Sequence, residues 1–145
     1  KANLSLLCRD LTDLATYCKP LSNPIFKLMK RVLPGPFTFI LTATNDVSKI
    51  FKTNKKTVGI RVPDNAIVQA IVNQLGHPLV SSSIHSEDEI LDYITEPTEI
   101  YEEWKHRVDY VVDGGVGKNQ GSTVLDCTES EAYIIREGLG MDQLN

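Results

Sequence analysis

The sequence predicts an α/β fold in which a mixed sheet is flanked by helices, and three observations point to it. Short apolar runs rich in Val, Ile, Phe and Thr, typical of strands, alternate with segments whose apolar residues recur at helical spacing. Most changes of pattern coincide with Pro, Gly or a helix-capping side chain. The 145 residues contain no internal repeat, low-complexity segment or linker, so we expect residues 1–145 to form one domain.

The first half of the chain is expected to alternate strands and helices. Ser22-Asn23-Pro24 is the strongest helix start, because a capping side chain precedes Pro at the first helical position. Apolar residues recur at helical spacing from Ile25 to Val32, and Pro34-Gly35-Pro36 ends the helix. The other elements expected here are strands at 3–8, 37–42 and 57–61, a short helix capped by Asp10 or Thr12, a short helix or turn at 45–53, and a helix at 66–75 behind a turn and cap at 63–65.

The second half continues the alternation and is strongly acidic at its start. Ser86 and Glu89 have the spacing of a capping box, which predicts a helix through about Ile94. The remaining elements expected are a strand at 79–83, a second acidic helix at 98–107, a buried strand at 108–112, a turn at 113–115, and strands at 122–126 and 132–136.

Charge is distributed unevenly, although the net charge is only −4. Residues 1–61 carry eleven Lys and Arg against three Asp and Glu, whereas residues 62–145 carry four against sixteen. An acidic protein is a poor non-specific binder of nucleic acid, but the basic half alone could attract an anion. The alternative interpretation is a salt-bridged, solvated surface.

Several function classes find no support in the sequence. No apolar run approaches the roughly 18 residues of a membrane span and no secretory signal opens the chain, so we expect a cytoplasmic protein without a membrane partner. Cys8, Cys18 and Cys127 are widely spaced and form no CxxC pair, which fits a reducing compartment and argues against a metal site. Residues 114–118 (GGVGK) lack the spacing of a phosphate-binding loop.

Polar and basic side chains stand at the ends of four predicted strands. Arg61 ends one strand, 81–83 (SSS) end another, Ser122 and Thr123 begin a third, and Arg136 ends a fourth. Ligands of open α/β sheets bind at strand ends, where loops converge. Because Arg donates in a planar fork and Ser and Thr supply short donors, these residues suit phosphate or carboxylate oxygens. Taken singly, each is also an ordinary surface residue.

Five sequence blocks resemble those of the YrdC/YciO-like family and follow in that family's order. One block alone would carry little weight, but five in order extend across nearly the whole chain. The blocks are 34–41 (PGPFTFIL), 57–64 (TVGIRVPD), 78–83 (PLVSSS), 122–126 (STVLD) and 135–138 (IREG).

The resemblance implies a twisted mixed sheet flanked by helices, with a concave basic cavity. It also implies a nucleotidyltransferase that makes threonylcarbamoyl-AMP from ATP, bicarbonate and L-threonine, for modification of adenosine 37 of tRNA. Mg²⁺ would be carried by the nucleotide, without a metal site of the protein's own. By the resemblance, the expected catalytic residues are Arg61, Ser83 and His85, and the expected nucleotide-binding residues are Pro34, Thr38, Ser122, Thr123 and Arg136.

Two departures from the family pattern accompany the resemblance. His85 stands where the synthases have Asn in an S-x-N pattern, and this variation looks more like the YciO branch, as does the segment 6–11 (LLCRDL). Imidazole does not reproduce the paired donor and acceptor of an amide. The family's basic K-x-R motif precedes the first strand found here, so the resemblance implies a single domain without the N-terminal portion of the usual one.

Two other functions stay open at this point. One is an RNA-binding module, for tRNA or ribosomal RNA, that uses the basic first half and the cavity. The sequence contains no aromatic RNA-binding signature that would support this function. An RNA-binding module of this kind would at least have to lose RNA affinity steeply as the salt concentration rises. The other is a YciO-type relative that binds a nucleotide without synthase activity. The sequence does not indicate the oligomeric state.

Overall fold

The structure is a computed structural model that describes residues 4–85 and 93–145. The chain divides into two compact units, which are described separately. The first, here called the sheet unit, comprises Lys1–Ser82 and Ser122–Asn145. The second, here called the insert unit, comprises Ser83–Gly121, which lies in the sequence between the two parts of the sheet unit.

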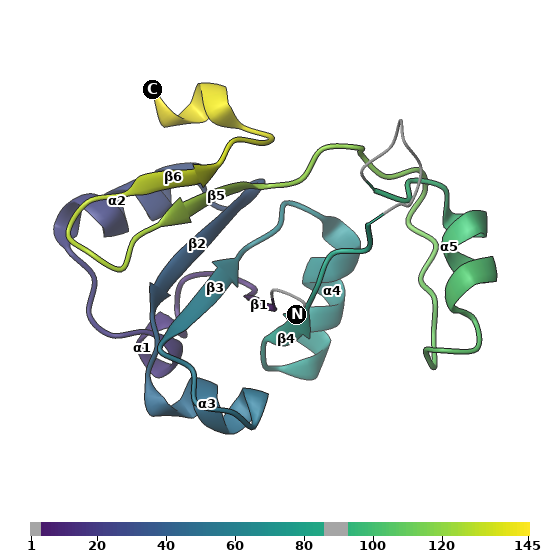
Figure 1. Ribbon diagram of the computed structural model, residues 1–145, viewed down its shortest axis with the longest axis horizontal. Coiled ribbons are helices and arrows are strands. Elements are labelled where there is room, and N and C mark those ends of the chain that lie inside the picture. Colours follow the sequence, from purple (N-terminus) through teal and green to yellow (C-terminus); the bar gives the residue numbers. More distant parts are fainter. Residues whose placement is uncertain (1–3, 86–92) are drawn as a thin grey trace. The chain divides into compact units, whose positions relative to one another are not determined.

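The sheet unit contains a six-stranded mixed sheet with the order β4-β1-β3-β2-β5-β6 (Figure 1). Two neighbouring pairs, β1 with β3 and β2 with β5, run parallel, and the other three pairs are antiparallel. This confirms the mixed sheet predicted from the sequence. The strands are β1 (Ser5–Leu7), β2 (Phe37–Thr42), β3 (Thr57–Arg61), β4 (Leu79–Ser81), β5 (Thr123–Asp126) and β6 (Tyr133–Arg136).

One face of the sheet is apolar and forms the core. Successive strand residues point to opposite faces, so the alternating burial of β2 places Phe37, Phe39 and Leu41 on the core face. Ile25 and Met29 belong to the same buried cluster and come from one helix, α2. The core therefore lies between this sheet face and helices of the first half of the chain.

The described residues of the sheet unit form four α-helices, and α4 shows most clearly why a helix begins and ends where it does. The Asn65 side chain accepts hydrogen bonds from the backbone N–H groups of Ile67 and Val68 at 3.0 and 3.1 Å. Gly76 ends the helix with a φ of 75°, a left-handed conformation that glycine adopts without steric cost. The helices are α1 (Leu14–Tyr17), α2 (Asn23–Val32), α3 (Asn45–Phe51) and α4 (Ala66–Leu75).

The expected cap of α2 is only partly right. The helix starts next to Ser22, but the Ser22 side chain makes no capping hydrogen bond. Its hydroxyl instead donates to the backbone carbonyl of Ser130 at 2.9 Å. Ser22 therefore marks the start of the helix as predicted, but its hydroxyl donates to a carbonyl distant in the sequence and does not cap the helix. The helix expected at Asp10 or Thr12 begins later, at Leu14.

The insert unit contains one described helix, α5 (Pro97–Trp104), which confirms the second acidic helix with a shorter C-terminal end. The buried strand predicted at 108–112 is wrong. Val108, Tyr110 and Val112 are exposed, and the described residues give this segment no strand partner. An apolar run becomes a strand only where a neighbouring strand pairs with it.

Two further segments complete the description. The helix predicted from the capping box at Ser86 lies mostly outside the described residues, and Ile94 at its expected end is not helical. The chain ends in a short 3₁₀ helix, Met141–Leu144, that the sequence patterns did not predict. No helix among the described residues is long and apolar enough to cross a membrane.

Candidate functional site

Most of the residues predicted to bind a ligand lie at one edge of the sheet, by which we mean the edge formed by the ends of the strands and not by an outer strand. Arg61 is the last residue of β3, and β3 runs antiparallel to β2, so it ends where β2 begins, beside Thr38. Phe37 pairs with Thr123, so β5 begins at the same edge, and Arg136 pairs with Val124 at the end of β6. Residues far apart in the sequence, such as Thr38 and Ser122, which are separated by 84 positions, therefore lie at one edge of the sheet.

Hydrogen bonds join three of these side chains. The hydroxyl oxygens of Thr38 and Ser122 lie 2.7 Å apart. The Arg136 guanidinium donates to the Ser122 carbonyl oxygen from Nε at 3.1 Å and from one terminal nitrogen at 2.8 Å, and that nitrogen is also 3.2 Å from Ser122 Oγ. Ser122 is buried, whereas Arg136 is exposed. The hydrogen bonds therefore hold an exposed positive charge in a fixed position beside two hydroxyls, of which that of Ser122 is buried.

The sheet face opposite the core is polar and built from small residues near this group. A Cβ placed on Gly59 would lie 3.1 Å from the Ser5 Cβ and 3.4 Å from the Thr38 methyl carbon. Gly59, Ser5 and Thr38 therefore share this face, which we call the polar face. Arg61 lies two residues beyond Gly59 on the same strand, so its side chain leaves β3 on the polar face as well.

Ser5 and Ser81 extend the polar face towards the outer strand β4, and their hydroxyl oxygens lie 3.4 Å apart. Ser5 was missed in the sequence analysis. Its position between apolar residues of a short strand is a weak signal, because a half-buried strand alternates apolar and polar residues whether or not it binds a ligand.

Thr123 does not share the polar face, although it was predicted to bind the nucleotide. Its side chain is fully buried on the core side. The hydroxyl donates to the carbonyl oxygen of Leu139 at 2.7 Å and accepts from the backbone N–H of Gly138 at 3.1 Å. The geometry favours a role in holding the turn after β6, and so in positioning Arg136, over direct contact with a ligand.

Pro34 is exposed in the turn that precedes β2. The next residue, Gly35, is buried, and its backbone N–H donates to the Val62 carbonyl at 2.9 Å. A Cβ on Gly35 would come within 2.3 Å of the Val32 carbonyl oxygen, so only glycine fits. The turn positions the Pro36 carbonyl to accept from the Thr123 N–H at 3.0 Å, which anchors the start of β5.

Ser83 and His85 belong to the insert unit. Ser83 and His85 are both exposed, and His85 forms an isolated antiparallel bridge with Tyr93. The two rings stack at a tilt of 31° with centroids 4.9 Å apart. Their predicted catalytic role is not tested by these contacts and stays a prediction.

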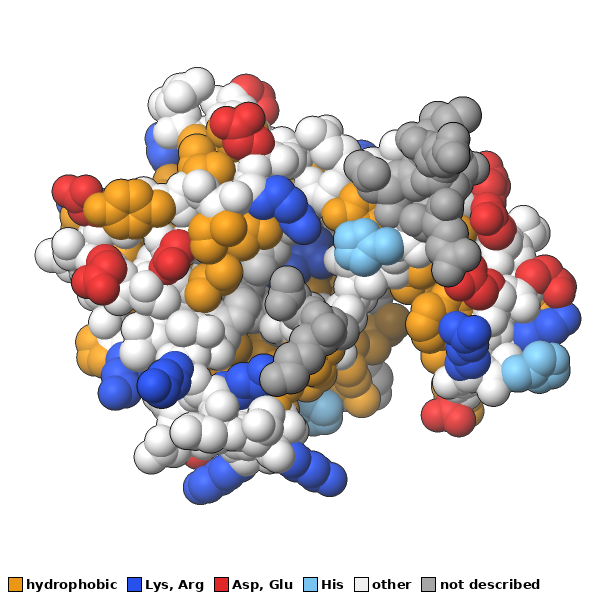
Figure 2. Space-filling model, viewed as in Figure 1, with side chains coloured by type: hydrophobic (Ala, Val, Ile, Leu, Met, Phe, Trp, Pro, Cys, Tyr) orange, Lys and Arg blue, Asp and Glu red, His pale blue; other side chains and the backbone are white. Residues whose placement is uncertain are grey.

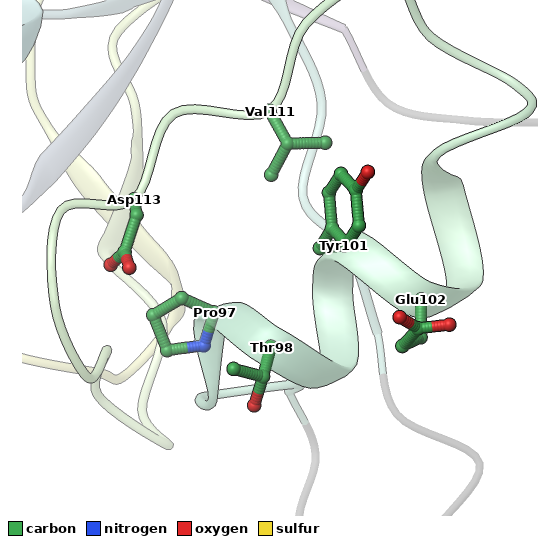
Figure 3. Close-up of a pocket in the computed structure, with 6 residues that line it drawn as sticks. All are labelled: Pro97, Thr98, Tyr101, Glu102, Val111 and Asp113. Carbon is green, nitrogen blue, oxygen red and sulfur yellow. The ribbon is translucent and has the colours of Figure 1, made fainter.

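The insert unit also contains a pocket of about 270 Å³. Figure 3 shows α5 on one side of it and the segment with Val111 and Asp113 on the other. Glu102 forms an ion pair of 2.7 Å with Lys105, whose Nζ lies 5.7 Å from the centre of the Tyr101 ring. The pocket is lined by Pro97, Thr98, Tyr101, Glu102, Val111 and Asp113. Its carboxylates disfavour phosphate, so this pocket is not the basic cavity expected from the sequence, and that cavity stays a prediction.

The thiols offer no nucleophile at neutral pH. Burial, with smaller contributions from Asp13 and Asp10, raises the pKa of Cys8 to about 12. Burial and then Asp126 raise the pKa of Cys127 to about 12. The thiolate is the reactive form, so these side chains act as core residues. Within residues 4–85 and 93–145, no three His, Cys, Asp or Glu side chains are grouped as a metal site would require.

Comparison with known proteins links this arrangement to a family. The sequence profile of the Sua5–YciO–YrdC family, described as "Telomere recombination", matches residues 1–138. An uncharacterized protein of Haemophilus influenzae is 40% identical over 139 residues, which are 95% of this chain and 67% of that protein. A threonylcarbamoyl-AMP synthase of Bos taurus is 31% identical over 79% of this chain and 44% of its own length.

Solved structures agree with the sequence comparison. The crystal structure of Escherichia coli YciO superposes with a TM-score of 0.84 at 37% identity, covering 95% of this chain and 66% of that one. Sua5 of P. abyssi, crystallised with L-threonine, has a TM-score of 0.79 at 22% identity over 94% of this chain and 40% of that one, which shows the same fold.

This chain thus spans about two thirds of the length of its YciO-like relatives, and its identity to them exceeds its identity to the bovine synthase. The resemblance inferred from five short blocks is confirmed over nearly the whole chain. This protein belongs to the Sua5–YciO–YrdC family, and within it resembles YciO more than the synthase.

Proposed function

We propose that this protein is an ATP-using enzyme of the threonylcarbamoyl-AMP synthase type, acting on bicarbonate and L-threonine. The observation that carries the proposal is the joined group of Thr38, Ser122 and Arg136 at the sheet edge where Arg61 also ends its strand. Family membership supports it, since the bovine relative is named threonylcarbamoyl-AMP synthase and the P. abyssi relative was crystallised with L-threonine.

The proposed reaction needs charge stabilisation more than a side-chain nucleophile. Threonine, bicarbonate and ATP give threonylcarbamoyl-AMP, pyrophosphate and water. The carboxylate of the carbamate formed from threonine and bicarbonate attacks the α-phosphorus, and the bond from that phosphorus to the pyrophosphate oxygen breaks. Negative charge then develops on the leaving pyrophosphate, so cations and hydrogen-bond donors fixed beforehand lower the barrier.

The side chains at this sheet edge fit an anionic ligand. Two arginines and two hydroxyls are donors, and Arg presents planar, bidentate hydrogen bonds to phosphate or carboxylate oxygens. Magnesium bound to the ATP phosphates would neutralise part of their charge. In this proposal Arg61 and Arg136 hold anionic oxygens of the substrates, and the hydroxyls of Thr38 and Ser122 fix their orientation.

Four predicted residues have other parts in the proposal. Thr123 acts through the turn that its hydroxyl holds, and Pro34 acts as part of the turn that places Gly35 and Pro36. The catalytic roles that the family pattern implies for Ser83 and His85 stay predictions, and the variant His85→Asn described below tests the second of them.

A nucleotide-binding function without synthase activity is the second candidate. His85 in place of Asn favours it, as does the higher identity to YciO than to the synthase. An imidazole nitrogen either donates or accepts a hydrogen bond, whereas one amide does both at neighbouring atoms.

The deciding experiment uses the full-length protein with ATP, Mg²⁺, bicarbonate and L-threonine, followed by mass spectrometry. Threonylcarbamoyl-AMP formed with pyrophosphate over many turnovers, only when threonine is present, is the expected result. ATP binding without product would favour the second candidate, and the variant His85→Asn would then show whether this residue alone prevents turnover. If the protein neither bound ATP nor formed product, both candidates would be refuted, and RNA would be the next ligand to test.

A further inference from the structure

The insert unit is acidic, in contrast to the basic first half of the chain. Residues 83–121 carry ten Asp and Glu against three Lys and Arg, a net charge of −7. In Figure 2, red acidic side chains gather at the right of the view, where Figure 1 shows α5. Such a surface attracts cations and repels phosphate. A ligand of the insert unit therefore differs in charge from the anionic ligands expected at the sheet edge.

The pocket of about 270 Å³ in this unit lies between two segments that are held to each other. One wall is the beginning of α5, and the other is the segment with Val111 and Asp113 (Figure 3). The backbone N–H of Gly117 donates to the carbonyl oxygen of Thr95 at 2.8 Å. This bond joins the chain just beyond the second wall to the chain just ahead of the first, so the two walls are fixed side by side.

The lining of the pocket combines aliphatic carbon, an aromatic ring and carboxylates. Pro97 and Val111 supply the aliphatic carbon, and Figure 3 shows the Tyr101 ring and Asp113 on opposite sides of the pocket. The Tyr101 side chain is 51% exposed, so a ligand can reach its ring. An aromatic face and a carboxylate both attract an organic cation, while aliphatic walls pack against its methylene groups.

The Asp113 carboxylate is held in a fixed orientation and keeps its charge available. One of its oxygens accepts a hydrogen bond from the backbone N–H of Gly115 at 2.9 Å, which closes a local turn. Among the residues that the structure describes, no Lys, Arg or His forms an ion pair with Asp113. The pocket therefore contains a positioned carboxylate whose charge these residues leave unpaired.

A neighbouring lysine shows which kind of cation this surface favours. The Lys105 Nζ lies 2.7 Å from a Glu102 carboxylate oxygen and 5.7 Å from the centre of the Tyr101 ring. The hydrogen bond to Glu102 and the charge of that carboxylate raise the pKa of Lys105, so its charged form is favoured. Lys105 neutralises Glu102, and Asp113 remains for an ammonium group from outside the chain.

We propose that this pocket binds a primary alkylammonium group, with its charge between Asp113 and the Tyr101 ring and its methylene chain against Pro97 and Val111. A metal ion matches the lining less well. Hard cations take several oxygen ligands, and within residues 4–85 and 93–145 no three His, Cys, Asp or Glu side chains are grouped to supply them. The proposal uses only residues of the insert unit and is independent of the proposed function.

Free polyamines and the lysine side chains of proteins carry this same group, and the test distinguishes the two sources. The full-length protein is titrated with each ligand while its backbone amide signals are followed by NMR. The ligand n-pentylammonium is compared with n-pentanol, which has the same chain without the charge. Spermidine represents a free polyamine, and the peptide acetyl-Gly-Lys-Gly-amide represents a lysine side chain. Whichever of these two binds more tightly identifies the source.

The expected result depends on charge and is confined to the pocket. Amide signals of the residues that line the pocket should shift saturably with n-pentylammonium. Its affinity should exceed that of n-pentanol by at least about fivefold at about 50 mM salt. Absence of saturable binding by all three ammonium ligands, or equal affinities for n-pentylammonium and n-pentanol, would overturn the proposal.

Two double variants with identical changes locate the binding site. Tyr101→Leu/Asp113→Asn removes the ring and the charge, while the amide oxygen of Asn can still accept from the Gly115 N–H. The matched control is Tyr110→Leu/Asp109→Asn, since both residues are exposed and neither lines the pocket. We expect n-pentylammonium affinity to fall at least about fivefold in the pocket variant and less than about twofold in the control. Equal losses in the two variants would refute the site.

A pair of single variants protects the test from a folding defect. Circular dichroism shows whether the pocket variant is folded. If it is not, Asp113→Asn and Asp109→Asn replace the double variants, and affinity is expected to fall at least about threefold in the first alone. Unchanged n-pentylammonium affinity in a folded Asp113→Asn variant would contradict the proposed ion pair.

Discussion

The hydroxyl groups of Thr38 and Ser122 lie 2.7 Å apart although 84 positions separate them in the sequence. The contact exists because β2 and β5 run parallel and begin at the same edge of the sheet. Arg136 comes from β6 on the far side of β5 and reaches the same serine. Three strands therefore combine to form one donor group, which is the basis of the proposed function.

The first prediction concerns Ser122→Ala. This change removes the hydroxyl that meets Thr38 and Arg136 while leaving the carbonyl that holds the guanidinium. We expect ATP affinity to fall several-fold and stability to fall by about 0.5–1.5 kcal/mol. Calorimetric titration with Mg·ATP and urea unfolding measure the two effects.

Ser81→Ala is the matched control for that change. Its hydroxyl lies on the same polar face but on the outer strand β4, next to the hydroxyl of Ser5. It should leave ATP affinity unchanged. Equal losses in both serine variants would show that the Thr38–Ser122 contact has no special part in binding.

The second prediction separates Thr123 from the ligand-binding residues. Thr123→Val keeps the shape of a buried side chain but removes the hydroxyl that bonds Leu139 and Gly138. We expect a loss of about 1–3 kcal/mol in the free energy of unfolding, since two backbone groups lose their partner. Thr57→Val, at an exposed strand position, should change it by less than about 0.5 kcal/mol. If both substitutions had the same small effect, the Thr123 hydroxyl would not anchor this turn.

The third prediction uses two glycines with nearly the same backbone conformation. Gly140 and Gly76 have φ values of 84° and 75°. A Cβ on Gly140 would lie 2.8 Å from a Phe37 ring carbon, whereas nothing lies within 4 Å of one on Gly76. Gly76→Ala should therefore cost about 1–2 kcal/mol from backbone strain alone, and Gly140→Ala about 2–5 kcal/mol. Thermal and urea unfolding measure both, and equal costs would contradict the close packing of Gly140 on Phe37.

The fourth prediction is a loss of stability at alkaline pH that involves Cys8. Burial raises the pKa of this thiol from 9.0 to about 12 in the folded protein. The neutral thiol is thus favoured by folding, so its contribution is complete below about pH 9 and declines as the pH rises towards 12. The stability difference between the wild-type protein and Cys8→Ala should narrow as the pH rises above 9. A difference that stays constant to strongly alkaline pH would contradict the assignment.

Sequence patterns predicted best those helices and strands whose ends are fixed by residues close to them in the sequence. The helix at 66–75 was predicted to the residue, because Asn65 caps it and Gly76 ends it. The strand at 37–42 was predicted equally well, because its alternating apolar residues face a core that their own side chains help to form. The segment at 108–112 has a similar apolar composition but no neighbouring strand among the described residues, and sequence patterns contain no information about that neighbour.

The candidate site was predictable only in part, because the sequence indicates where strands end but not which strands are neighbours. Strand ends identified Arg61, Ser122 and Arg136, and the sheet order, which decides that they share one edge, came only from the structure. The burial of Thr123 had a sequence signal that was overlooked. It stands two residues before the apolar Leu125, so both belong to one face of the strand, and that face is the core.

The fifth prediction, which tests the proposed nucleotide site most directly, concerns the affinity of the Arg61→Ala variant for Mg·ATP. The change removes a guanidinium proposed to hold anionic oxygens of the substrate, and Arg31→Ala, on the exposed side of α2, is the matched control. Isothermal titration calorimetry of the full-length, folded proteins measures the dissociation constants. We expect at least about tenfold weaker binding for Arg61→Ala, corresponding to the loss of about 1.4 kcal/mol or more, and wild-type affinity for Arg31→Ala. Unchanged ATP affinity in a folded Arg61→Ala variant would contradict a nucleotide site at this edge of the sheet.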